Sequence, residues 1–345
     1  MIPLETTLKK LAEETEPVSV ASLYALSGLD RADLDKVRSV WPAIPLERRQ
    51  VAIRHLVDIT EDNFEVDFNS IYRLGLVDAD PDVRAAAIDG LWEDGDPVLI
   101  GPFIKLLQSD AAENVRVAAA SALGHFVLLG EYEELPAEKV EPVVTVLQAV
   151  FANTGESIEV RRHAVEALGF HSSPEIVQII QQAYAQPDER MRISAVFAMG
   201  RSVDDHWGDI VLKEMDAHDP EMRFEAARAA GEIEYAPAIN PLIRLIEDVD
   251  DDVQRAAVWS LGQIGGDKAR QVLTAILESD AEHLHEIAEE ALDELEFNSG
   301  SHPLGMLDFD EDDEEWVLDA VDEDEDEDED EVAYEEDDDE AEDED

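Results

Sequence analysis

Cysteine is absent from this 345-residue chain, and aromatic residues make up only 6% of it. The lack of thiols excludes disulfide bonds, a cysteine nucleophile and cysteine-ligated metal sites. Alanine, leucine, isoleucine and valine supply most of the apolar content, which favours closely packed helices over a β-sandwich. The N-terminal segment has no apolar stretch typical of a signal peptide, and no apolar run is long enough to cross a membrane. We therefore expect a soluble, cytoplasmic protein.

Basic residues are scarce, with 25 Lys and Arg against 86 Asp and Glu, for a net charge of −61. Residues 308–345 alone hold 28 of the acids and no base, so 58 acids oppose 25 bases in the remainder. Affinity for phosphate backbones and anionic lipids comes from Lys and Arg, so we expect neither direct nucleic-acid binding nor membrane binding. The same electrostatic argument favours protein partners with a basic surface.

A repeated segment dominates the rest of the chain. An apolar residue followed by Arg recurs, and from the third arginine of the series onward the spacing is 31 residues, four times in succession. The arginines are Arg84, Arg116, Arg161, Arg192 and Arg223, with Arg49 as a fainter first copy and Gln254 and His285 in the same slot of the last two copies. Earlier spacings of 35, 32 and 45 predict loop insertions in the N-terminal half, the largest around 125–138.

Small residues keep fixed places in each copy. Alanine lies three residues after the anchor in all eight copies, and glycine lies eight after it in five. Offsets of −1, +3 and +7 fall on one helical face, so each copy begins with a helix that packs closely on its neighbours. A second apolar helix follows, often with Pro in its first turn, and Asp80, Asp219 and Asp250 are placed to cap the next first helix. Each copy is therefore predicted to be a helical hairpin.

The pattern D-P-x-V-R-x-x-A-x-x-x-L-G resembles the short HEAT repeats named after phycobilisome lyases, over about 45–296. The resemblance implies an all-α fold, a right-handed α-solenoid of about seven to eight hairpins. Within it, we interpret the five arginines as a structural ladder of inter-repeat Asp–Arg pairs rather than an anion site. Ten residues before successive anchors lie Gln182, Lys213 and Arg244, which should stack along one exposed face as a candidate partner-binding row for an acidic segment of a partner or of the chain's own tail. An ordinary solvent-facing row is the alternative.

The two ends differ from the repeats at 45–297. Residues 1–44 read as short helices that cap the first repeat, with a separate docking module as the alternative. Residues 298–307 form a Gly/Ser/Pro linker, and 308–345 an acidic tail that we expect to be disordered. Trp316 and Leu318 interrupt this acidity, which predicts a short helix that forms on docking; chance apolar content is the alternative.

Enzymatic interpretations find little support in the residues. Deoxyhypusine hydroxylase resembles this chain in its repeats but binds two irons through recurring His-Glu pairs, whereas this chain has only His285-Glu286. Nothing marks a tetrapyrrole pocket of the kind that the bilin lyases require. We expect no cofactor, no metal and no catalysis.

The leading hypothesis is a non-catalytic interaction scaffold or adaptor whose acidic tail engages or shields basic partners, as a chaperone does. The alternative is an enzyme or lyase accessory of the bilin-lyase type. A third interpretation is that the acidity adapts the chain to high salt, which agrees with 7 Lys against 18 Arg but does not account for the tail.

Overall fold

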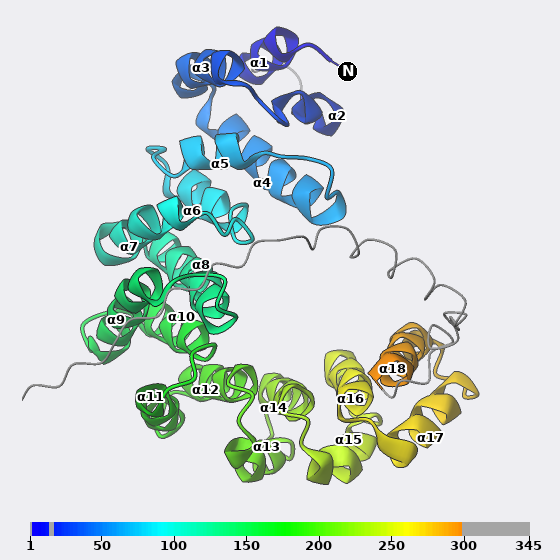
Figure 1. Ribbon diagram of the computed structural model, residues 1–345. Coiled ribbons are helices and arrows are strands. Elements are labelled where there is room, and N and C mark those ends of the chain that lie inside the picture. Colours follow the sequence, from blue (N-terminus) through cyan, green and yellow to red (C-terminus); the bar gives the residue numbers. More distant parts are fainter. Residues whose placement is uncertain (1, 14–16, 299–345) are drawn as a thin grey trace, which may run out of the picture. The chain divides into compact units, whose positions relative to one another are not determined.

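The repeated segments fold as helical hairpins stacked in sequence order (Figure 1). The computed structural model describes residues 2–13 and 17–298, and in these ranges it contains helices and turns but no β-strand. Residues 46–277 form seven hairpins, and one further helix follows them. The predicted all-α solenoid is thus confirmed for the described part of the chain. The linker and the acidic tail, 298–307 and 308–345, fall outside it apart from residue 298.

Each hairpin has a first helix that carries the anchor and a second helix that packs behind it. The first helices are α4 (Leu46–Asp62), α6 (Pro81–Asp89), α8 (Glu113–Glu131), α10 (Ile158–Leu168), α12 (Glu189–Arg201), α14 (Pro220–Glu232), α16 (Asp251–Ile264) and the terminal α18 (His285–Asn298). The second helices are α5 (Asn69–Gly75), α7 (Ile100–Ser109), α9 (Ala137–Ala152), α11 (Pro174–Tyr184), α13 (Gly208–Glu214), α15 (Ile239–Leu245) and α17 (Gly266–Leu277).

Aspartates begin several first helices, as predicted from the sequence. The Asp80 carboxylate accepts hydrogen bonds from the backbone N–H groups of Asp82 and Val83, at 3.1 and 3.2 Å. Asp250 caps α16 in the same way, and the Asp219 carboxylate caps α14 by accepting one hydrogen bond, from the Glu221 N–H. These bonds satisfy N–H groups that have no partner within the helix, so each cap fixes where a repeat starts.

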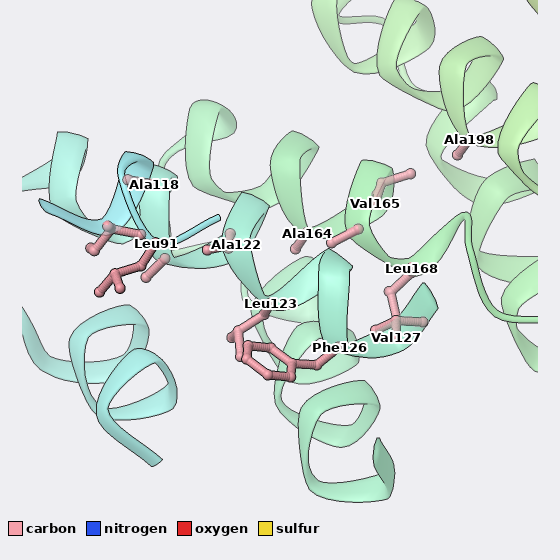
Figure 2. Close-up of a cluster of buried hydrophobic side chains, with 14 of the residues drawn as sticks. Leu91, Ala118, Ala122, Leu123, Phe126, Val127, Ala164, Val165, Leu168 and Ala198 are labelled. Atoms are coloured by element: carbon pink, nitrogen blue, oxygen red, sulfur yellow. The ribbon is translucent and has the colours of Figure 1, made fainter. Parts of the chain in front are cut away.

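The first helices form a continuous seam of small side chains. All eight alanines three residues after the anchors are fully buried, which confirms the predicted register. A Cβ added at Gly169 would lie 2.8 Å from the Cα of Ala198, and one at Gly200 would lie 2.9 Å from the Cα of Ala229. The glycines are therefore required because successive first helices approach to backbone contact there. Figure 2 shows part of the apolar cluster along this seam, including Ala164 and Ala198.

The largest insertion mostly lengthens helices, and the loop predicted around 125–138 is confined to residues 132–136. Helix α8 has 19 residues and α9 has 16, whereas α10 and α11 have 11 each. The additional residues prolong both helices of the third hairpin. A spacing reveals only the length of an insertion, and apolar side chains such as Phe126 and Val127, both buried, continue the helical pattern into it.

The N-terminal residues contact the first hairpin through several hydrogen bonds. They form α1 (Leu4–Ala12), α2 (Val20–Leu23), α3 (Arg31–Val40) and short 3₁₀ turns at Tyr24–Leu26 and Trp41–Ala43. Arg48 of α4 donates from Nε to the Leu11 carbonyl at 2.8 Å, and Gly28 N–H donates to the Asp67 carbonyl at 2.8 Å. These contacts agree with a cap at 1–44, and the boundary itself stays a prediction.

Candidate partner-binding surfaces

Two of the anchor arginines tie neighbouring loops together in the same manner. Arg84 donates from Nε and Nη2 to the Asp110 carboxylate at 2.8 and 2.7 Å, and from Nη1 to the carbonyl of Asp78 at 2.8 Å. Arg223 makes the equivalent bonds to Asp248 and to the carbonyl of Ala217. Each guanidinium thus joins the loop before its own helix to the loop before the next first helix. Because these donors are used inside the stack, they are not offered to an external anion.

The remaining anchors vary this arrangement. Arg116 pairs with Glu156 at 2.9 Å and Arg192 with Glu214 at 3.1 Å. Arg49, the faint first copy, pairs with Asp78 at 3.0 Å. In three of the anchor pairs the partner acid, Asp78, Asp110 or Asp248, lies two residues before the next helix cap.

Arg161 departs from the predicted ladder. It donates from Nε to the Phe151 carbonyl at 2.9 Å, and its guanidinium lies 5.6 Å from the centre of the Phe151 ring. The reason is local: Gln186 stands two residues before the Asp188 cap, where three other copies place Asp78, Asp110 or Asp248, and no nearby acid takes over the role. The ladder is therefore interrupted at α10, within the described residues.

The proposed row of Gln182, Lys213 and Arg244 occupies exposed positions on α11, α13 and α15. The Lys213 amino group donates to Glu214 and to the Tyr184 hydroxyl, both at 2.8 Å. Arg244 Nη2 lies 3.7 Å from Asp216. The two positive charges are thus countered by neighbouring acids. The other two predicted binding residues, Trp316 and Leu318, lie outside the described residues.

An open groove lies between α9 and α11; of the residues singled out in the sequence, Gln182 and Arg161 line it. It consists of two adjoining cavities of about 670 and 640 Å³ that share Gln148 and Glu175. Its apolar lining includes Val140, Val144, Phe151 and Ile179. The groove could have been predicted from the 45-residue spacing between Arg116 and Arg161, because this spacing reflects the lengthened α8 and α9, which supply one wall of the groove.

The opposite layer, the exposed face of the first helices, carries a network of ion pairs. Arg162 forms ion pairs with Glu159 and Glu166. Glu232 forms ion pairs with Arg201 at 3.1 Å and with Arg228 at 3.0 Å.

Glu225 of α14 lies beside this network, half-buried. Within the described ranges it has no hydrogen bond or ion pair of its own. Burial raises the pKa of Glu225 to about 7. This carboxyl group therefore opposes folding once it is ionised.

The histidines do not assemble a metal site in the part of the chain that the structure describes. No group of three or more His, Asp or Glu side chains there is arranged to hold an ion. His285 Nε2 lies 3.1 Å from the Ser279 carbonyl, and His283 Nε2 lies 2.7 Å from Gln254 Oε1, so the two rings have separate partners.

The same described residues include no helix with the length and apolarity needed to span a bilayer.

Known proteins share this architecture. The sequence model of the HEAT-repeat family matches residues 73–142 and 208–293 of this chain. The complex of CpcE and CpcF of phycocyanin lyase from Nostoc is 18% identical, with 82% of this chain and 97% of that one aligned and a TM-score of 0.53. The Escherichia coli protein YibA is 16% identical over 82% and 99% of the two chains, with a TM-score of 0.45. Importin beta is 16% identical over 88% of this chain and 47% of its own, with a TM-score of 0.44.

No curated protein sequence matches this chain significantly. At such identities the structural likeness shows the fold alone. The family match, the buried alanine column and the stacked hairpins together show that HEAT repeats are present in residues 73–142 and 208–293.

Proposed function

We propose that the protein is a non-catalytic interaction scaffold for partner proteins with basic surfaces. The observation that carries the proposal is the way charge is divided in the described residues. Most of the 25 Lys and Arg form ion pairs with acids of the chain itself, some half-buried, as Arg84 with Asp110 and Arg223 with Asp248, and others exposed. The acids outnumber them and many remain exposed, so the field outside the stack is negative.

The acidic tail at 308–345 adds to this field. Its 28 acids should attract a basic partner from a distance and speed its encounter, an effect that salt weakens over a Debye length of about 10 Å at 0.1 M. Charge alone gives little specificity, so we assign the anchoring contacts to apolar groups, including Trp316 and Leu318. The exposed row of Gln182, Lys213 and Arg244 would instead contact an acidic segment of the partner or of the chain's own tail.

The test is affinity capture on the immobilised full chain, followed by binding kinetics with the recovered proteins. We expect the captured proteins to be predominantly basic and to be released as salt rises. Replacement of the Asp and Glu residues in 322–331 by Asn and Gln should mainly slow association, whereas Trp316→Ala should mainly speed dissociation. Capture of acidic and basic proteins in equal measure would contradict the proposal.

A lyase accessory, the alternative function, is addressed by the absorption spectrum of the purified protein and by metal analysis. The likeness to the phycocyanin lyase complex supports the same fold and no shared activity. Bound pigment or stoichiometric iron would overturn the non-catalytic assignment.

A further inference from the structure

We propose that the groove between α9 and α11 binds an extended peptide segment of the basic partner, one that carries both apolar and basic side chains. The inference rests on the proposed function, because it assigns a site to that partner. It depends on three properties of the groove: its carboxamide lining, its apolar floor and the charge at one of its ends.

The carboxamides come from both walls. Gln178 and Gln182 project from α11 with four-residue spacing, and Gln148 lines the same cavity from α9. Gln186 lines it from the bend that follows the end of α11. Within the described residues none of these four side chains has a hydrogen-bond partner. A carboxamide offers both a donor and an acceptor, so it is suited to bond a peptide group whatever the sequence.

The spacing of these amides fits an extended chain. Four residues of α-helix advance about 6 Å, and two residues of an extended peptide advance about 6.7 Å. Gln178 and Gln182 could therefore bond alternate peptide groups of one bound segment. The 16 residues of α9 are about 24 Å long, which an extended segment of about seven residues would cover.

The floor and the charge select the side chains of the segment. Val140, Val144 and Phe151 line the groove from α9 and would receive alternate apolar side chains. Glu133, Glu141 and Glu175 are exposed around the cavity nearer the start of α9. No basic residue lines that cavity, where His171 lies 3.4 Å from Glu131. Basic side chains of the segment would meet these carboxylates.

The charge argument also decides against the chain's own tail as the occupant. Residues 308–345 carry 28 acids and no base, so they would bring like charge to an acidic rim. The apolar residues at 304–321 remain the competing occupant, and the experiment includes them.

The experiment measures fluorescence anisotropy of labelled peptides with the full chain, at about 0.3 M salt, where attraction to the acidic tail is screened. The first probe is an eight-residue peptide of alternating Lys and Val. The second replaces Lys by Glu, the third carries N-methyl groups on alternate backbone amides, and the fourth is the 304–321 sequence. We expect the first probe to bind, and each of the others to bind at least about tenfold more weakly.

Two matched variants test the site itself. Gln178→Ala combined with Gln182→Ala should weaken the first probe about tenfold, since two hydrogen bonds are lost. Gln181→Ala removes an exposed carboxamide of the same helix that does not line the groove, and should leave binding unchanged. Melting temperatures of both variants should equal that of the parent, which shows that any loss is local.

Several results would overturn the inference: no binding of the Lys-Val peptide, equal binding of its N-methylated form, tighter binding of 304–321, or no effect of the double variant. Its failure is distinguishable from failure of the scaffold function. If the double variant still captures basic proteins from solution with unchanged salt dependence, the scaffold proposal stands and only the groove assignment is lost.

Discussion

The two layers of the hairpin stack are built under different constraints. Along the seam of first helices the small residues recur in register, and glycines such as Gly169 and Gly200 meet the backbone of the next helix. Helix length does not separate the layers, since the first helices range from 9 residues in α6 to 19 in α8 and the second helices from 7 in α13 to 16 in α9. The second helices do not repeat this small-residue seam, and a groove opens between α9 and α11.

The difference separates the residues that hold the stack together from those available for binding. Backbone contact at the seam leaves no space for variation, because even one methyl group would force two helices apart. The second helices contact their neighbours less closely, so their exposed side chains can change without loss of the fold. Binding is therefore expected on the second layer, and the seam is expected to determine stability.

The largest expected effect comes from filling the seam. Gly169→Val should lower the free energy of unfolding by about 3 kcal/mol, because a Cβ at Gly169 lies 2.8 Å from the Cα and 2.9 Å from the Cβ of Ala198. Gly101→Ala, on α7 with no atom within 4 Å of the added methyl group, should instead gain about 0.5–1 kcal/mol from helix propensity. Urea unfolding measures the change in unfolding free energy of both variants. If both variants are destabilised, or both are stabilised, the two layers do not differ in packing as described.

Next in size is the loss of one arginine of the ladder. Arg223→Ala should cost about 2 kcal/mol, because it leaves the Asp248 side chain, which is 8% exposed, without its bidentate partner. Arg244→Ala, on the second layer, breaks an exposed pair at 3.7 Å and should cost less than about 0.5 kcal/mol.

The Arg223 effect should depend on pH. The hydrogen bonds from Arg223 hold the pKa of Asp248 below its usual range, so the stabilisation is present above the unfolded pKa and is lost as the pH falls through the folded pKa. Thermal unfolding of the variant and the parent should therefore converge in acid. A constant difference from neutral to acid pH would contradict the pairing.

A smaller effect of opposite sign is expected at Glu225. Burial raises its pKa from 4.5 to about 7, so the folded state holds the proton more tightly, and stability falls as the pH rises through this interval. Glu225→Gln should therefore stabilise the protein by about 1 kcal/mol at pH 8 and by almost nothing at pH 4. The exposed Glu221→Gln of the same helix is the control, and a stabilisation that does not depend on pH would show that Glu225 is not desolvated.

The sequence predicted the hairpins and the buried alanine column because these features repeat in register. The same residue type recurs at the equivalent position of eight repeats, so chance does not explain the pattern. It did not predict that residues around 125–138 extend α8 and α9, since a spacing contains no information on conformation. Nor did it predict the contact of Arg161 with Phe151, which arises because Gln186 is not an acid and no neighbouring acid pairs with Arg161 in its place. The groove escaped notice for the same reason: it arises where the repeat is irregular.

Hydrogen–deuterium exchange of the full chain, with and without a captured basic partner, tests the central claim most directly. The account predicts that the partner protects the exposed turns and helices of the second layer, above all α9 and α11, and leaves the already slow amides of the first-helix seam unchanged. Protection confined to the first helices, or no protection within residues 2–13 and 17–298, would contradict it.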